Sequence, residues 1–252
     1  MKRKNILITG ASSGLGKGMA IEFAKLGCNL ALCARRLENL QELQKEIEEI
    51  NPTSKVFIRS LDVNNWDDVF TVFHAFRSDF RGTGGKLDRV IVNAGMGKGA
   101  PLGTGYFKQN MQTAQTNFTA ALAQFEAAME IFREQNDGHL VAISSMSAFR
   151  GFRGAMTVYA ATKAGLKSLA EGLRVDVANK PIKVSTVFPG YIRTEINEKI
   201  RNLPFVISLD KGSRLLVEAI ESEKDNSYVP AWPWYLMKKT MPFWTVGMLR
   251  KL

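Results

Sequence analysis

A glycine-rich turn near the N-terminus constrains the fold of this chain more than any other feature. Residues 6–9 are an apolar run typical of a β-strand, TGASSGLG at 9–16 continues from it, and Leu15, Met19 and Phe23 then recur at helical spacing. Glycine lets the backbone turn tightly and lets a phosphate approach it, and a helix start offers free N–H groups and a positive dipole end. The turn therefore predicts a dinucleotide site, although its spacing, G-x-x-x-G-x-G, differs from the common G-x-G-x-x-G. The residues assigned to it are Gly10, Ser12, Ser13, Gly14, Leu15 and Gly16.

The rest of the chain continues this alternation of strand and helix. Strands alternating with crossover helices predict a parallel sheet that is covered on both faces. We therefore expect an α/β fold, Rossmann-like and doubly wound, with a mostly parallel seven-stranded sheet. No linker, repeat or low-complexity segment divides residues 1–252, which indicates a single domain. The expected strands are residues 6–9, 29–33, 55–60, 87–93, 139–145, 182–188 and 227–229.

Composition narrows the class of protein. The chain has 252 residues, 45% of them hydrophobic and 23% charged, which argues against a disordered chain, a fibre or a membrane bundle. Two cysteines argue against a disulfide framework or a cysteine zinc site, and His74 and His139 lie far apart without ligand-spaced acids, so no metal site is expected. No stretch is apolar for long enough to span a membrane. A cytoplasmic protein is expected, with peripheral membrane contact left open.

Two arginines at the end of the second expected strand bear on the cofactor. NAD sites usually carry an acidic residue about 20 positions after the glycine turn. Here Arg35 and Arg36 occupy that place, 19 and 20 residues after Gly16. Guanidinium groups suit a 2′-phosphate, so NADP(H) is favoured over NAD(H). The alternative is a pair of solvated arginines that open a surface helix.

A tyrosine and a lysine form the candidate catalytic pair. Tyr159 and Lys163 are spaced i, i+4, so both side chains lie on one face of an expected helix. A nearby cation stabilises a phenolate, whose free pKa is about 10. Such a pair alone is common on surface helices. Here, however, Ser144 and Ser145 end a strand nearby, at the sheet edge where open α/β folds bind ligands.

Taken together, these motifs resemble the short-chain dehydrogenase/reductase family over about residues 4 to 195. The ordered set is TGASSGLG at 9–16, Leu61-Asp62-Val63, Asn93-Ala94-Gly95, Asn117, Ser145, Tyr159 with Lys163, and Pro189-Gly190 with Thr194. The resemblance implies an NADP(H)-dependent oxidoreductase that interconverts a carbonyl and an alcohol, with a moderately apolar substrate.

The resemblance also implies roles for single residues. Tyr159 would be the general acid in reduction and the base in oxidation, and Ser145 would hydrogen-bond the substrate oxygen. Lys163 would bind the nicotinamide ribose and lower the pKa of Tyr159, and Asn117 would hold a water that links Lys163 to solvent as a proton relay. Further positions expected at the cofactor are Asp62, Val63, Asn93, Ala94, Gly95, Pro189, Gly190, Ile192 and Thr194.

Two departures from the family pattern leave alternatives open. The spacing from Ser145 to Tyr159 is 14 residues, one more than is usual, so Ser144 or Ser147 could replace Ser145, which is favoured. Position 13 is serine where many NADP-preferring relatives have a basic residue, so the 2′-phosphate would rest mainly on Arg35, with Ser12 and Arg36 assisting.

The remaining expectations concern partners and the C-terminal region. Family members usually form dimers or tetramers through the helices that carry Asn117 and Tyr159, so a homo-oligomer is expected. A substrate lid is expected at about 191–209. The tail at 228–252 is aromatic and basic, without acids, and would contact a membrane surface, its own cleft or another subunit. The alternative function is a non-catalytic NADP(H) sensor or a membrane- or partner-binding protein. The net charge is +10, but the sequence contains no recognised nucleic-acid-binding module, so no nucleic-acid partner is expected.

Overall fold

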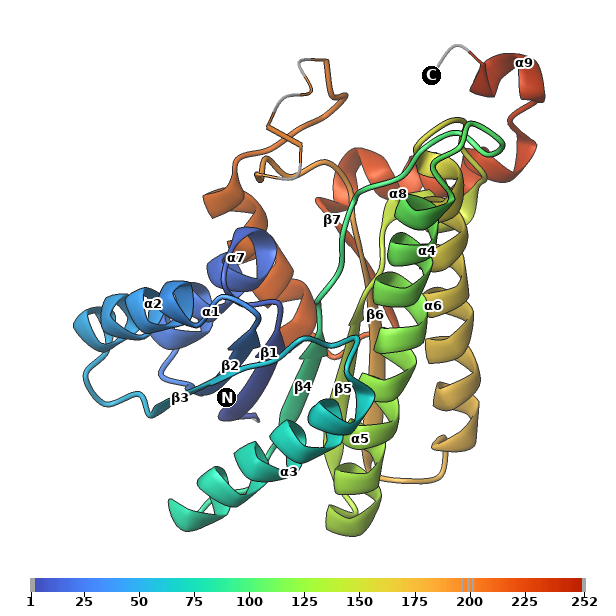
Figure 1. Ribbon diagram of the computed structural model, residues 1–252. Helices are drawn as coiled ribbons and strands as arrows, with labels where there is room; N and C mark the ends of the chain where they lie inside the picture. The colour runs from blue at the N-terminus through green and yellow to red at the C-terminus, as the bar shows by residue number, and fades with distance from the viewer. Residues whose placement is uncertain (1–2, 196, 199, 201, 251–252) are drawn as a thin grey trace.

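A seven-stranded sheet organises the computed structural model, which describes residues 3–195, 197–198, 200 and 202–250 (Figure 1). The strand order is β3-β2-β1-β4-β5-β6-β7, and every neighbouring pair is parallel. This confirms the expected doubly wound α/β fold, with a sheet that is wholly rather than mostly parallel. The strands are β1 (Asn5–Thr9), β2 (Asn29–Ala34), β3 (Val56–Ser60), β4 (Arg89–Val92), β5 (Gly138–Ile143), β6 (Ile182–Pro189) and β7 (Asn226–Val229).

Helices cover both faces of the sheet (Figure 1). Successive residues of β1 point to opposite faces: Leu7 joins the core beneath α3, α5 and α6, whereas Ile6 and Ile8 join the core beneath α1, α2 and α7. A parallel strand covered on both faces is apolar throughout, as β1 is. The helices are α1 (Gly14–Lys25), α2 (Leu37–Ile50), α3 (Trp66–Gly82), α4 (Phe107–Ala114), α5 (Ala120–Gln135), α6 (Met156–Asp176), α7 (Leu209–Glu221), α8 (Ala231–Thr240) and α9 (Val246–Leu249), with short turns η1 (Gln115–Thr119), η2 (Met146–Phe149) and η3 (Met241–Phe243). None of the helices in the described residues is long and apolar enough to cross a membrane.

The strand order also fixes where a ligand can bind. The chain moves outward from β1 to β2 and β3, then returns to place β4 on the other side of β1. Ligands of open α/β sheets bind at this reversal, outside the carboxyl ends of the strands. The glycine turn follows β1 and Asn93 follows β4, so both lie at the reversal.

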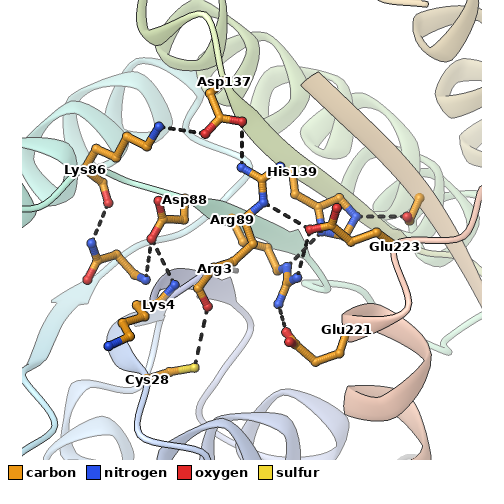
Figure 2. A network of polar contacts seen from close by, with 12 residues as sticks. Arg3, Lys4, Cys28, Lys86, Asp88, Arg89, Asp137, His139, Glu221 and Glu223 are labelled. Carbon is orange, nitrogen blue, oxygen red and sulfur yellow. Dashed lines mark hydrogen bonds and ion pairs between the residues drawn. The ribbon is translucent and has the colours of Figure 1, made fainter. Parts of the chain in front are cut away.

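A network of charged side chains closes the opposite, amino-terminal edge of the sheet (Figure 2). Arg89, the first residue of β4, is fully buried and pairs with Glu221, the last residue of α7, and with Glu223 just after it. Its Nε donates a hydrogen bond to Nδ1 of His139 at 2.9 Å. Arg3 bonds Glu223 at 3.0 Å and Asp137 at 2.8 Å. The network therefore joins the N-terminus, β4, β5 and α7.

His139 has a structural place in this network. Burial lowers the pKa of its imidazole well below the usual value, and the positive charge of Arg89 acts in the same direction. Because Nδ1 accepts the Arg89 hydrogen bond, Nε2 carries the proton of the neutral ring and lies 2.9 Å from the hydroxyl oxygen of Ser185. Both cysteines are buried, and burial raises the pKa of each thiol to about 12.

Candidate active site

The glycine turn packs directly against the end of β4. Gly10 has φ of +65°, and a Cβ there would lie 2.9 Å from Cα of Ala94, so no other residue fits. A Cβ on Gly16 would lie 2.3 Å from the carbonyl oxygen of Gly10. Asn93 holds the two segments together, because its Nδ2 donates to the carbonyl of Thr9 at 2.9 Å. The sequence thus fixes a tight turn at the carboxyl end of β1.

This turn has the features of an anion site. Ser13 is the N-cap of α1 and its side chain makes no capping hydrogen bond within the described residues, so the free N–H groups of the first turn are not satisfied by it. No acidic residue lies in that turn. The unsatisfied donors and the helix dipole favour a phosphate there. Thr194, whose Cγ2 would lie 3.6 Å from a Cβ on Gly14, comes from the segment after β6 and borders the same site.

Arg36 is the arginine that reaches the turn. Its Nη2 donates to the hydroxyl oxygen of Ser13 at 2.8 Å and to that of Ser12 at 3.2 Å. Arg35 is exposed at the end of β2, and its carbonyl accepts a hydrogen bond from Ser60 at 3.3 Å. A cluster of one guanidinium and two hydroxyls is therefore assembled beside the turn, with the second guanidinium next to it in the chain.

The segment after β3 leaves the same carboxyl edge of the sheet. Asp62 is exposed after β3, and its Oδ1 accepts hydrogen bonds from the backbone and side-chain N–H groups of Asn64 at 3.0 and 2.9 Å. Val63 is buried beside it. The residues present thus fit a dinucleotide with an additional phosphate: a glycine cradle, an uncapped helix start and a basic cluster.

Lys163 lies at the centre of the candidate catalytic group. It is buried, and its Nζ donates to the carbonyl oxygen of Ile143, at the end of β5, at 2.8 Å. Burial lowers the pKa of its ammonium to about 8. The ring centroid of Tyr159 lies 5.9 Å from Nζ. Desolvation raises the pKa of the Tyr159 hydroxyl, opposed by a hydrogen bond with the Ser145 side chain. Tyr159, Ser145 and Lys163 thus meet at the carboxyl edge of the sheet.

The geometry separates the three candidate serines. Ser144 is buried, and its hydroxyl donates to the backbone carbonyl of Lys163 at 2.9 Å, which occupies it in joining β5 to α6. The backbone N–H of Ser147 donates to Oγ of Ser145 at 3.2 Å. Ser145 is partly exposed and bonds Tyr159. These contacts support Ser145 as the serine that faces a substrate.

Asn117 lies in an irregular helical turn that the residue pattern does not predict. It belongs to η1, a π-helical turn between α4 and α5, a feature often found at functional sites. Its side chain accepts from the N–H of Met96 at 2.7 Å and donates to the carbonyl of Met96 at 2.8 Å. A Cβ on Gly95 would lie 3.2 Å from Oδ1 of Asn117 and 3.7 Å from Nζ of Lys163. The loop after β4 is therefore anchored beside Lys163.

The family of this chain follows from its match to a known family model. The model of the family described as short chain dehydrogenase matches residues 4–203. The chain belongs to this family. It is therefore an oxidoreductase of the short-chain dehydrogenase class, a family that uses NAD(H) or NADP(H).

Relatives and solved structures agree with this assignment. An uncharacterized oxidoreductase of Mycobacterium tuberculosis is 45% identical over 239 residues, covering 95% of this chain and 93% of the relative. A hydroxysteroid 11-beta-dehydrogenase 1-like protein of Xenopus laevis is 30% identical, covering 100% of this chain and 86% of its own length. A short-chain dehydrogenase from Sphingobium yanoikuyae in complex with NADPH has a TM-score of 0.78 and 25% identity, covering 99% of this chain and 96% of its own. An alcohol dehydrogenase from Comamonas testosteroni, described as specific for bulky-bulky ketones, has the same TM-score and identity, covering 100% and 96%.

In this short-chain dehydrogenase the segments after β6 and β7 also gather at the site. Ile192 is buried and pairs with Ile207 in an isolated β-bridge, which joins the two ends of the expected lid. Residues 196, 199 and 201 of the lid lie outside the described residues. Trp234 of α8 packs on Gly190, directly after β6. Sequence reasoning did not single out Trp234, and its only signal was the aromatic composition of the tail.

Proposed function

We propose that this oxidoreductase interconverts a carbonyl compound and the corresponding alcohol, with NADP(H) as its cofactor. The observation that carries the proposal is the meeting of Tyr159, Ser145 and Lys163 at the sheet edge that also holds the glycine turn. When bound, the cofactor supplies or accepts the hydride.

Tyr159 acts on the proton that accompanies this reaction. Because burial raises the pKa of its hydroxyl, Tyr159 is protonated at neutral pH and can donate to a carbonyl oxygen. Ser145, already hydrogen-bonded to Tyr159, donates to the same oxygen and stabilises its developing charge. Lys163 is mostly charged below a pH of about 8, and its ammonium stabilises the phenolate that remains. Asn117 holds the loop after β4 beside Lys163 and would position the relay water.

The basic cluster beside the turn supports NADP(H) over NAD(H). A 2′-phosphate at this place would replace the hydroxyls of Ser12 and Ser13 as the partner of Arg36. We expect Arg36→Ala to weaken NADPH binding by about 10- to 100-fold, since charge-assisted hydrogen bonds are lost, and to change NADH binding by less than about threefold. Tryptophan fluorescence titrations of both cofactors measure the two affinities.

Arg35→Ala is the matched comparison for this titration. Arg35 is next in the chain, carries the same charge and is exposed as Arg36 is, but among the described residues its side chain makes none of the hydrogen bonds to the turn that Arg36 makes. We expect a smaller loss of NADPH affinity than for Arg36→Ala, because the Arg36 guanidinium already lies on the turn. Equal NADPH and NADH affinities in the unaltered protein would contradict the cofactor assignment while leaving the enzyme class in place.

The substrate is proposed to be moderately apolar. One relative is described as a hydroxysteroid dehydrogenase-like protein and one structural neighbour as specific for bulky-bulky ketones, and both point to large apolar carbonyl compounds. Apolar side chains also surround the carboxyl edge of β6, where Phe188, Met146 and Trp234 form a buried cluster.

A homo-oligomer is proposed to form through α5 and α6. A groove of about 610 Å³ runs between these helices, and Leu122 on its rim is 38% exposed. We expect the protein to sediment as a dimer or tetramer and Leu122→Arg to shift it toward monomer, because a charge cannot be buried unpaired at an interface. Val175→Arg, on a residue of α6 that does not line the groove, should leave the sedimentation coefficient unchanged. A monomeric wild-type protein would contradict the proposal. The groove residues are Phe118, Leu122, Phe125, Glu126, Met129, Arg133, Gly165, Ser168, Leu169, Gly172, Leu173 and Asp176.

A further inference from the structure

Exposed hydrophobic side chains gather at the carboxyl edge of the sheet. Two segments carry more than half of those described: residues 102–111, which end the loop after β4 and begin α4, and residues 232–248, which follow β7. In Figure 1 the start of α4, α8 and α9 all lie at the upper right. The exposed side chains are Leu102, Tyr106, Phe107, Met111, Trp232, Tyr235, Leu236, Phe243, Val246 and Met248.

The tail at 232–248 is held on the protein by its inner side chains. Trp234 and Met241 are buried in a cluster with side chains of η2 and β6. The outer side chains have no such cover, since Trp232 is 74% exposed and Phe243 is 82% exposed. A contiguous apolar surface exposed on a folded protein marks an interaction site. The tail thus contacts its own chain with one face and leaves the other face for a partner.

The two exposed segments border each other through residues 150–155, which connect η2 to α6. Nη2 of Arg150 donates to the carbonyl oxygen of Trp244 in the tail at 2.8 Å. A Cβ on Gly99, in the loop after β4, would lie 2.2 Å from the carbonyl oxygen of Ala155. Both segments therefore pack on the same short stretch of chain. We call residues 98–111, 150–155 and 232–250 together the carboxyl-edge surface.

The charges on the carboxyl-edge surface are all of one sign. The sequence has no aspartate or glutamate at 94–125, at 138–170 or at 228–252. Within the part of the chain that the structure describes, none of the exposed cations of this surface forms a salt bridge. The surface therefore combines apolar side chains with positive charge that the protein itself does not neutralise. The exposed cations are Lys98, Lys108, Arg153, Lys239 and Arg250.

An anionic lipid surface fits this combination. Exposed aromatic and aliphatic side chains enter the boundary between headgroups and acyl chains, and cations beside them contact anionic headgroups. Lys239 and Tyr235 show the arrangement directly: both are exposed, and Nζ lies 4.8 Å from the ring centroid. A second copy of the chain fits less well, because a two-fold contact through this surface would place cations opposite cations without a carboxylate between them.

We propose that the carboxyl-edge surface binds an anionic bilayer. Trp232, Phe243 and Phe107 enter the headgroup boundary, and the exposed lysines and arginines contact the headgroups. This inference goes beyond the proposed function, because binding to lipid requires neither Tyr159 nor a cofactor.

Vesicle sedimentation of the full chain tests the proposal. The probes are vesicles of phosphatidylcholine alone and vesicles with about one quarter phosphatidylglycerol, each at about 50 mM and about 500 mM salt. We expect binding to the anionic vesicles to be at least about tenfold tighter than to the neutral ones, because the cations are attracted to the anionic headgroups. Higher salt should weaken this binding by about tenfold, since it screens exposed charges.

The double variant Trp232→Ser with Phe243→Ser removes two of the inserted rings. Its affinity for anionic vesicles should fall by about tenfold or more, because less apolar area leaves water on binding. The matched control is Leu26→Ser with Val175→Ser, which removes two exposed apolar side chains at the ends of α1 and α6. These helix ends lie at the opposite edge of the sheet, so the control should bind as the wild type does.

A second pair of variants separates charge from apolar contact. Lys239→Gln with Arg250→Gln should weaken binding to anionic vesicles by about tenfold and reduce its dependence on salt. Lys180→Gln with Lys183→Gln removes the same charge from exposed positions beside the start of β6, and should change the affinity by less than about twofold.

Three results would overturn the proposal: a wild-type protein that does not sediment with anionic vesicles, equal binding to neutral and anionic vesicles, or undiminished binding by Trp232→Ser with Phe243→Ser. If the wild type ignored vesicles and that double variant dissociated an oligomer, the surface would be a contact between copies of the chain instead. Circular dichroism of each variant verifies that the fold is retained.

Discussion

Tyr159→Phe is expected to lower kcat/KM for carbonyl reduction by about 10³-fold and to leave NADPH affinity nearly unchanged. A positioned general acid contributes about 10²- to 10⁴-fold, and phenylalanine removes only the hydroxyl that would donate the proton. The same change removes the hydrogen bond with Ser145, while the ring can keep its place beside Lys163. Steady-state kinetics with NADPH and a naphthyl ketone, together with a fluorescence titration of NADPH, measure the two effects separately.

Tyr106→Phe is the control for this variant. Tyr106 precedes α4 and is 55% exposed, so losing its hydroxyl should leave kcat/KM within about twofold of wild type. Wild-type rates in Tyr159→Phe would assign the proton to another group. A wild-type protein that binds NADPH tightly but reduces no carbonyl compound would favour the non-catalytic sensor, because a sensor does not need the Tyr159 hydroxyl.

The sequence predicted those parts of the site that depend on local conformation. The glycine turn was predictable because the φ of Gly10 and the closeness of Gly16 to the Gly10 carbonyl exclude a side chain, and such constraints appear directly in the residue pattern. The seven strands followed equally from their short apolar runs, because each expected strand overlaps an observed one. The family match then confirmed the enzyme class that the ordered motifs implied.

Contacts that depend on the direction of a side chain were harder to predict from the sequence. Arg35 and Arg36 are adjacent, and only the structure shows that Arg36 reaches Ser12 and Ser13. Ser144 and Ser145 also differ in direction, because Ser144 bonds the backbone of α6 whereas Ser145 bonds Tyr159. A residue pattern gives the position of such a side chain in the chain but not the neighbour that it meets.

Contacts between distant segments were not predictable at all. Trp234 meets Gly190 from a tail whose composition suited a membrane surface as well as a cleft. Arg3 and Glu223 are 220 positions apart, and neither belongs to a motif. Arg89 begins a strand, where an exposed charge would be ordinary, yet it is fully buried. The charged network at the amino-terminal edge therefore emerges only from the assembled sheet.

Arg89→Met is expected to lower the free energy of unfolding by about 3–5 kcal/mol, because it removes one side of a buried ion pair. Arg89 is 1% exposed in its side chain, whereas its partners Glu221 and Glu223 are 26% and 12% exposed, so water can compensate these carboxylates only in part. Nδ1 of His139 loses its donor in the same variant. Urea unfolding followed by fluorescence and circular dichroism measures the change.

Lys17→Met is the control that separates burial from charge. It removes the same charge from a pair with Glu46 whose side chains are 40% and 42% exposed, so the expected loss is below about 1 kcal/mol. If Arg89→Met lowered the free energy of unfolding by no more than Lys17→Met does, the attraction within the network would be offset by the desolvation of Arg89. The network would then select this fold over alternatives without adding to its stability. Because the network lies at the sheet edge opposite the site, the folded variant should keep the kcat and the NADPH affinity of the wild type. A loss of either in fully folded Arg89→Met would instead mean that β4 transmits the change to Asn93 and the glycine turn.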